Sequence, residues 1–178
     1  LVARGEVFVV SMLTGATRRI TDTPAEERHL SYGPDGRSLV YASERSGRWQ
    51  VMEAQLRRAQ DNGFTGAAPF TESVLVANEG DAFQPLLSPD GSRIAYRQDR
   101  NSLHVLDRQT RRSVQVLGKE AVYSYSDGDL NFAWSPDGRW LATRTGFEDT
   151  AEIELVDATG QAARRNLSRS GFTDIRPV

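Results

Sequence analysis

Short stretches in which apolar and polar residues alternate recur along the whole chain, and each ends at a group of turn-forming residues. Such runs predict half-buried β-strands, because successive side chains of a strand point to opposite faces. A helix would show an apolar stripe at helical spacing, and even the best candidate, residues 53–61, has none. We therefore expect an all-β chain, with residues 57–73 forming an inserted loop.

One turn sequence occurs three times in the same context. Its copies are Gly33-Pro34-Asp35-Gly36, Ser88-Pro89-Asp90-Gly91 and Ser135-Pro136-Asp137-Gly138. Proline presets the φ angle of a tight turn, aspartate accepts backbone N–H bonds, and glycine takes the positive φ that other residues adopt only with strain. Each copy lies between two strand-like runs, so it predicts a hairpin turn. The Pro, Asp and Gly of each copy are the predicted structural turn residues.

The spacing of these turns defines a repeat. Their aspartates are 55 and 47 positions apart, and each unit holds about four strand-like runs, which is the length of a propeller blade. The predicted blades are a partial one at 1–23, complete ones at 28–77, 81–117 and 129–168, and the start of another at 173–178.

These repeats predict a single propeller fragment over residues 1–178. It is a partial β-propeller of four-stranded antiparallel blades, with about four blades' worth of strands. The ring is expected to be open, or to be completed by another segment or another chain. Open ends expose strand edges and sheet faces, so self-association through them is an expected interaction.

The composition excludes several functions. The chain has 22 basic and 24 acidic side chains and a formal net charge of −2, so it lacks the basic footprint of a nucleic-acid-binding protein. No apolar run approaches the roughly 20 residues that cross a bilayer. The absence of cysteine excludes thiol catalysis and cysteine-bound zinc. We expect neither nucleic acid nor a membrane span among the interactions of the chain.

The sequence carries no recognisable catalytic motif. It has no Gly-x-Ser-x-Gly elbow, no His-Glu-x-x-His pair and no glycine-rich phosphate loop. Its only histidines, His29 and His104, permit a Ser-His-Asp triad in principle, but a structural histidine held by a hydrogen-bond partner is the favoured interpretation. We therefore predict no catalytic, metal or cofactor-binding residue, and no cofactor.

The segment before the third turn offers the best candidate ligand contact. Tyr123 and Tyr125 lie in the predicted crossing between two blades and are candidates for peptide contact, with wedging between blades as the alternative. In the same segment, Asp127, Asp129 and Asn131 have the spacing that opens a calcium loop. However, the positions of the sharp-turn glycine and of the bidentate glutamate hold other residues, so a structural crossover is favoured.

Arginines occur in pairs near the predicted outer strands. The pairs are Arg18-Arg19, Arg57-Arg58, Arg111-Arg112 and Arg164-Arg165. They indicate either docking of an acidic surface or protection of strand edges against sheet-to-sheet pairing, and edge protection is favoured.

The repeats resemble a known family over nearly the whole chain. Ser-Pro-Asp-Gly followed by a strand, as in residues 88–96, is similar to the repeats of TolB-like propellers, which also occur in tricorn-type peptidases and dipeptidyl peptidase IV-like proteins. The chain is most similar to the N-terminal propeller of bacterial tricorn-like serine peptidases, through residues 3–8, Gly15, Arg19-Ile20-Thr21 and residues 41–47. The first turn departs from the pattern, because Gly33 replaces the usual serine.

The resemblance implies a non-catalytic propeller domain of a tricorn-like serine peptidase, which gates or guides peptide substrates and scaffolds catalytic domains. No residue here matches the family's serine nucleophile, so the implied peptidase activity belongs to the parent protein. The alternative is a TolB-like periplasmic protein-binding propeller with no enzymatic activity. A third interpretation, a lyase with a metal in its channel, is opposed by the presence of only two histidines and no cysteine.

The resemblance also implies partners and a compartment. The expected partners are a peptide or protein ligand and the remaining domains of the parent chain. The expected location is periplasmic or otherwise extracytoplasmic, with the cytoplasm as the alternative.

Overall fold

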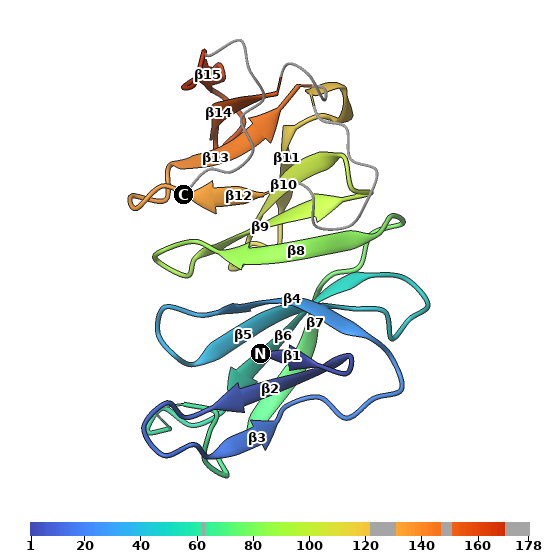
Figure 1. Ribbon diagram of the computed structural model, residues 1–178, viewed down its shortest axis with the longest axis vertical. Helices are drawn as coiled ribbons and strands as arrows, with labels where there is room; N and C mark the ends of the chain where they lie inside the picture. The colour runs from blue at the N-terminus through green and yellow to red at the C-terminus, as the bar shows by residue number, and fades with distance from the viewer. Residues whose placement is uncertain (62, 122–130, 147–150, 170–178) are drawn as a thin grey trace. The chain divides into compact units, whose positions relative to one another are not determined.

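The computed structural model describes residues 1–61, 63–121, 131–146 and 151–169 (Figure 1). In this part of the chain the regular structure is β-strand, apart from one short 3₁₀ turn, η1 (Lys119–Ala121). The strands in chain order are β1 (Val2–Ala3), β2 (Glu6–Val10), β3 (Thr17–Arg19), β4 (Glu27–Tyr32), β5 (Ser38–Ser43), β6 (Gln50–Leu56), β7 (Phe70–Val76), β8 (Ala82–Leu87), β9 (Arg93–Gln98), β10 (Ser102–Asp107), β11 (Ser113–Leu117), β12 (Phe132–Trp134), β13 (Trp140–Thr145), β14 (Glu152–Asp157) and β15 (Arg165–Asn166).

The strands form antiparallel sheets in which strands that are consecutive in sequence are neighbours. The strand orders are β1-β2-β3, β4-β5-β6-β7, β11-β10-β9-β8 and β12-β13-β14-β15. Four-stranded meanders of this kind are the blades of β-propellers. The prediction of an all-β chain with the blades of a partial, unclosed propeller is confirmed. Within the described ranges, no helix has the length and apolar character that crossing a bilayer requires.

The chain divides into two compact units, Leu1–Leu87 and Ser88–Val178. The first unit has its main hydrophobic core between its first two sheets. The core consists of Val7, Val9, Ile20, Leu39, Tyr41, Met52, Ala54, Leu56, Phe64 and Ala68. Every residue of β5 is buried, because β8 packs against β4 and β5 on the side away from β2. The Leu87 N–H donates to Ser31 Oγ at 3.3 Å, which joins β8 to β4.

The last four residues of the predicted loop 57–73 belong to a strand instead. β7 starts at Phe70, which pairs with Leu56 at the end of β6. Residues 71–73 are polar and exposed on this outer strand, so they show no apolar alternation. Backbone pairing to β6, which leaves no trace in the sequence, determines their conformation.

The second unit has a core between the sheet of β9, β10 and β11 and the sheet of β12 to β15. The core consists of Ala95, Leu103, Val105, Leu117, Ala121, Leu141 and Val156. In β13 buried residues alternate with half-buried ones, which is the pattern of a strand covered more fully on one face.

Candidate functional site

The predicted turn residues lie in three hairpins. Pro34, Asp35 and Gly36 connect β4 to β5, Pro89, Asp90 and Gly91 precede β9, and Pro136, Asp137 and Gly138 connect β12 to β13. The three glycines have φ angles of 67°, 70° and 67°. Each glycine N–H donates to the carbonyl three residues earlier, at 2.8–2.9 Å. Their geometry is that of turns, and nothing in it points to a ligand.

The serine that opens two of these turns adds side-chain bonds. Ser88 Oγ donates to Asp90 Oδ1 at 2.6 Å and accepts the Arg93 N–H at 2.9 Å. Ser135 makes the equivalent bonds to Asp137 and to the Trp140 N–H. Bonds from serine hydroxyls and backbone N–H groups lower the pKa of Asp90 to about 2.

Gly33 has a steric reason to replace serine in the first turn. A Cβ at position 33 would lie 2.3 Å from Ser38 Oγ and 2.8 Å from Asp35 Oδ1. The hydroxyl of Ser38 thus lies where the side chain of an opening serine would begin.

The tentative contact residues Tyr123 and Tyr125 lie outside the described residues, as do Asp127 and Asp129. Asn131 is described, and its carbonyl accepts a bond from Thr143 Oγ1 at 3.2 Å. A search of the described ranges finds no group of three or more His, Asp or Glu side chains that could hold a metal ion.

His104 has the geometry of a structural histidine. Its Nε2 lies 3.0 Å from Ser102 Oγ, and its ring stacks on Tyr96 at 5.4 Å between centroids. The Ser102 hydroxyl donates to the Gln98 carbonyl at 3.0 Å, so its proton is already engaged and it is not poised as a nucleophile. Burial lowers the pKa of His104.

His29 occupies a different environment, which it shares with Gln84. His29 in β4 and Gln84 in β8 have left-handed φ angles of 54° and 49°. Each stands four positions before the residue that opens the following turn, so the two are equivalent in the repeat. In β4 the register shifts between Arg28 and Ser31, which marks a bulge around His29. Both side chains are half-buried, and the His29 ring meets the Phe83 ring edge-on at 6.5 Å between centroids.

We call His29 and Gln84 the first-strand pair, because each lies in the first strand of its repeat. A non-glycine residue in the left-handed region costs about 1–3 kcal/mol, and such strain persists where the surroundings hold it in place. Bulges of this kind re-aim a side chain and are frequent beside functional sites. Two equivalent strained positions on neighbouring strands are therefore the strongest candidate for a binding surface in the described chain.

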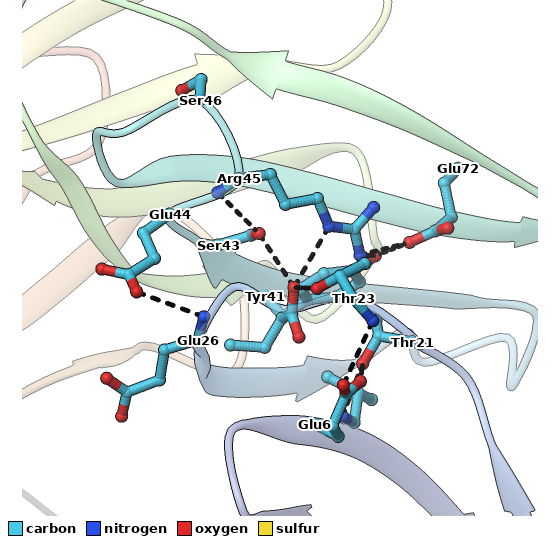
Figure 2. A network of polar contacts seen from close by, with 12 residues as sticks. Glu6, Thr21, Thr23, Glu26, Tyr41, Ser43, Glu44, Arg45, Ser46 and Glu72 are labelled. Atoms are coloured by element: carbon cyan, nitrogen blue, oxygen red, sulfur yellow. Dashed lines mark hydrogen bonds and ion pairs between the residues drawn. The ribbon is translucent and has the colours of Figure 1, made fainter.

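A buried polar network holds the start of β4, two residues before His29. Glu27 is completely buried, and its Oε1 accepts bonds from Thr23 Oγ1 at 3.1 Å, Ser43 Oγ at 3.0 Å and Arg45 Nε at 3.1 Å. Figure 2 shows Thr23, Ser43 and Arg45 converging from the crossover before β4, the end of β5 and the following turn. We call this the Glu27 network.

Arg45 extends the network to the outer strand of the sheet. Its Nη2 donates to Glu72 Oε1 on β7 at 2.8 Å, and Tyr41 also donates to Glu72 (Figure 2). Burial opposes the charge on Arg45, but its bonds to Glu72 and Glu27 outweigh this effect and raise the pKa of Arg45. Burial and the neighbouring Glu72 carboxylate raise the pKa of Tyr41, which therefore stays a neutral donor.

A second carboxylate fixes the crossover that leads into β4. Glu6 on β2 accepts bonds from Thr21 Oγ1 at 2.6 Å, from Arg19 Nη2 at 2.7 Å and from the Thr23 N–H at 3.2 Å. Burial opposes ionisation, but the bonds from Arg19 and Thr21 outweigh it and lower the pKa of Glu6. The segments 3–8 and 41–47, which carried the resemblance, thus meet across one crossover.

The hydroxyls in these networks donate to carboxylates that arginines already bond, so we assign the networks a positioning role. The sequence singled out His29 only as a histidine and did not identify Gln84, Glu27 or Glu72. Repeat register is the signal that reveals Gln84, because His29, Gln84 and Asn131 each stand four residues before a turn segment. No comparable signal marks the Glu27 network, whose members are far apart in the sequence.

Comparison with known proteins gives a family and several relatives. A family model described as TolB beta propeller domain matches residues 3–171. The chain is 24% identical over 183 residues to probable dipeptidyl-peptidase 5 from Aspergillus clavatus, a match that covers 91% of this chain and 25% of the relative. It is 29% identical over 145 residues to the protein TolB homolog of Chlorobium luteolum, with 80% of this chain and 29% of the relative covered.

Solved structures give the same fold. TolB from Acinetobacter baumannii aligns with a TM-score of 0.66 and 15% identity over 94% of this chain and 38% of that chain. Tricorn protease aligns at a TM-score of 0.47 and 13% identity over 92% of this chain and 14% of that chain, a likeness too low to bear on function. The chain spans about a quarter of the length of the peptidase from Aspergillus clavatus.

Proposed function

The chain belongs to the TolB beta-propeller domain family, and on that premise we propose that it is a non-catalytic propeller segment of a serine peptidase. In this role it gates or guides peptide substrates and scaffolds the catalytic domains of the parent protein. The observation that carries the proposal is the first-strand pair, His29 and Gln84, held at equivalent strained positions on neighbouring strands. The blades of a propeller surround a central channel, and in our proposal these two side chains line it and contact a passing peptide.

The Glu27 network supports this role by fixing where the pair points. Glu27 anchors the start of β4 through three neutral or charged donors. In β8 the residue before the strand, Asp81, accepts the Trp49 N–H at 3.0 Å, and the Ala82 N–H donates to the Trp49 carbonyl at 2.9 Å. Both first strands are thus tied down immediately before their left-handed residue, which is how a rigid binding surface is built.

The match to a dipeptidyl-peptidase favours a peptidase as the parent. Catalytic residues are then expected outside this chain, and the partners are a peptide and the remaining domains of the parent. Within the same proposal the protein is periplasmic or otherwise extracytoplasmic, the location implied by the TolB-like resemblance.

The second candidate function is a TolB-like protein-binding propeller without an enzyme attached. The relative that favours it is the TolB homolog of Chlorobium luteolum, 29% identical to this chain. A fluorophosphonate probe applied to the intact protein separates the two candidates. Labelling of a serine outside residues 1–178 supports the peptidase, and the absence of labelling in folded protein supports the binding propeller.

The guiding role is tested with His29→Ala and Gln84→Ala together in the intact protein. We expect kcat/KM for peptides of ten or more residues to fall about tenfold, with a dipeptidyl amide hydrolysed within about twofold of the wild type. Gln115→Ala, on the exposed outer strand β11, is the matched control. Equal effects on long and short substrates would remove the guiding role, and circular dichroism establishes that the variants are folded.

A further inference from the structure

The second unit contains a buried guanidinium without a counter-ion among the described residues. Arg97 lies on β9, and only 1% of its surface is exposed. Its pairing partner on β10, Leu103, is completely buried. Charged side chains are almost never this buried unless they are paired.

The bonds of Arg97 use only part of its hydrogen-bonding capacity. Its Nη2 donates to Thr143 Oγ1 at 3.2 Å, and its guanidinium lies 5.7 Å from the centre of the Phe132 ring. Nε and Nη1 are buried and have no hydrogen-bond acceptor among the described residues. Burial lowers the pKa of Arg97 to about 10, with no opposing contribution from a carboxylate. At neutral pH the group is therefore charged, desolvated and short of acceptors.

Two other arginines of the second unit show at which repeat position hydrogen-bond donors stay unused. Arg93, two residues earlier on the same strand, donates to the Gly138 carbonyl and lies 5.3 Å from the Trp134 ring centre. Arg144 occupies the position equivalent to Arg97 in the next repeat, six residues after the turn glycine, and its Nε is also buried with no acceptor in the part of the chain that the structure describes. The first repeat has Ala42 there. An arginine with unused donors thus recurs at one repeat position in the second unit.

We propose that Arg97 is an anion-binding site that takes a carboxylate. Carboxylates are planar monoanions that accept bonds from a guanidinium in its own plane, and one cation balances their charge. Phosphate would bring more negative charge than one guanidinium balances. Because Arg97 is 1% exposed and lies over the Phe132 ring, water is excluded from its guanidinium, which strengthens a charge-assisted bond once it forms. The site is independent of the first-strand pair, and its occupancy is measured without any enzymatic activity.

The test measures thermal unfolding of the intact protein in acetate and in sodium chloride at matched ionic strength. Acetate is expected to raise the melting temperature of the wild type saturably, and chloride is not. Arg97→Met is expected to melt no lower than the wild type without acetate, because it removes an unpaired buried charge, and to show no response to acetate. Calorimetric titration should find acetate binding to this variant weaker by at least about tenfold. Arg93→Met is the matched control and is expected to keep the response.

A second arm identifies the source of the carboxylate. An N-acetylated dipeptide with a free C-terminus is compared with the same dipeptide as its amide. Stabilisation by the acid alone assigns the site to a peptide C-terminus, and stabilisation by acetate alone assigns it to a small carboxylic acid. The proposal is overturned if acetate leaves the wild type unchanged. It is equally overturned if Arg97→Met melts well below the wild type without acetate, because the guanidinium would then already be paired within the chain.

Discussion

Arg45 in the first unit is partly buried and Arg97 in the second is almost completely buried. Their surroundings shift their pKa values in opposite directions. Arg45 lies between two carboxylates, Glu27 and Glu72, which raise its pKa. Arg97 is more deeply buried, has one hydroxyl as its acceptor among the described side chains, and has a lowered pKa. A buried guanidinium with carboxylate partners stabilises the structure around it. Without partners its burial destabilises the fold, unless a bound ligand supplies the missing acceptors.

The turns differ in the opposite direction: those of the second unit have more side-chain hydrogen bonds than the first turn. In the second unit the hydroxyls of Ser88 and Ser135 donate to their turn aspartates. In the first unit Gly33 takes the place of the serine, so this bond cannot form. Polar pairing is thus concentrated at the start of the first strand in one unit and in the hairpin turns in the other.

Removing each arginine separately tests whether only Arg45 is paired within the chain. Arg45→Met leaves the completely buried Glu27 and the Glu72 carboxylate without their cation, so we expect the free energy of unfolding to fall by about 3 kcal/mol. Arg97→Met should cause no loss in the absence of a carboxylate. Urea denaturation of both variants measures the difference. Equal losses would show that Arg97 is paired as Arg45 is, and the contrast between the units would disappear.

The turns of the second unit should be sensitive to backbone strain. Gly138→Val is expected to reduce the free energy of unfolding by about 1–3 kcal/mol, because valine is strained at a φ of +67°. The space itself is adequate, since an added Cβ would come no closer than 3.4 Å to Arg93 Nη2. Gly66→Ala is the control, because an added Cβ there meets nothing within 4 Å. A Gly138 variant that melts like the wild type would show that the turn does not depend on the left-handed glycine.

The fold was predictable because its signals are local in the sequence. Most residues of the site carry no such signal and were not predicted. The Pro-Asp-Gly repeats and alternating runs act over a few residues, and the all-β propeller architecture inferred from them is confirmed. The polar edge of β7 has no alternation and was assigned to a loop, although backbone pairing makes it a strand. The Glu27 network joins Glu27 to Arg45 and Glu72, and spacing along the chain does not reveal such contacts. The missing partners of Arg97 are likewise a property of packing alone.

The first turn offers a double-mutant test of why its serine is absent. Gly33→Ser should reduce the free energy of unfolding by about 1–2 kcal/mol, because the new Cβ would meet Ser38 Oγ at 2.3 Å. Ser38→Ala removes that hydroxyl, which is buried and has no hydrogen-bond partner, and should be close to neutral. The double variant should recover most of the loss and give this turn the serine–aspartate bond of the other two. Additive losses in the cycle would mean that Ser38 is not the obstacle.

The smallest expected effect is on stability at low pH, where turns with and without an opening serine should differ. The pKa of Asp90 is about 2, below the value of about 3.9 for an unfolded aspartate, so the native state favours its ionised form. Its contribution to stability is therefore fully present above about pH 4 and is lost as the pH falls through about 2. Because Asp90 is exposed, solvent screening limits this contribution to about 0.5 kcal/mol.

Asp90→Asn should be less stable than the wild type at pH 6 and should lose less stability on acidification, in thermal melts recorded from pH 6 to pH 2. Asp35→Asn is the matched control, since Asp35 accepts the Arg37 N–H at 2.9 Å but has no serine beside it. If the two variants respond to acid alike, the serine bond contributes nothing measurable to the turn.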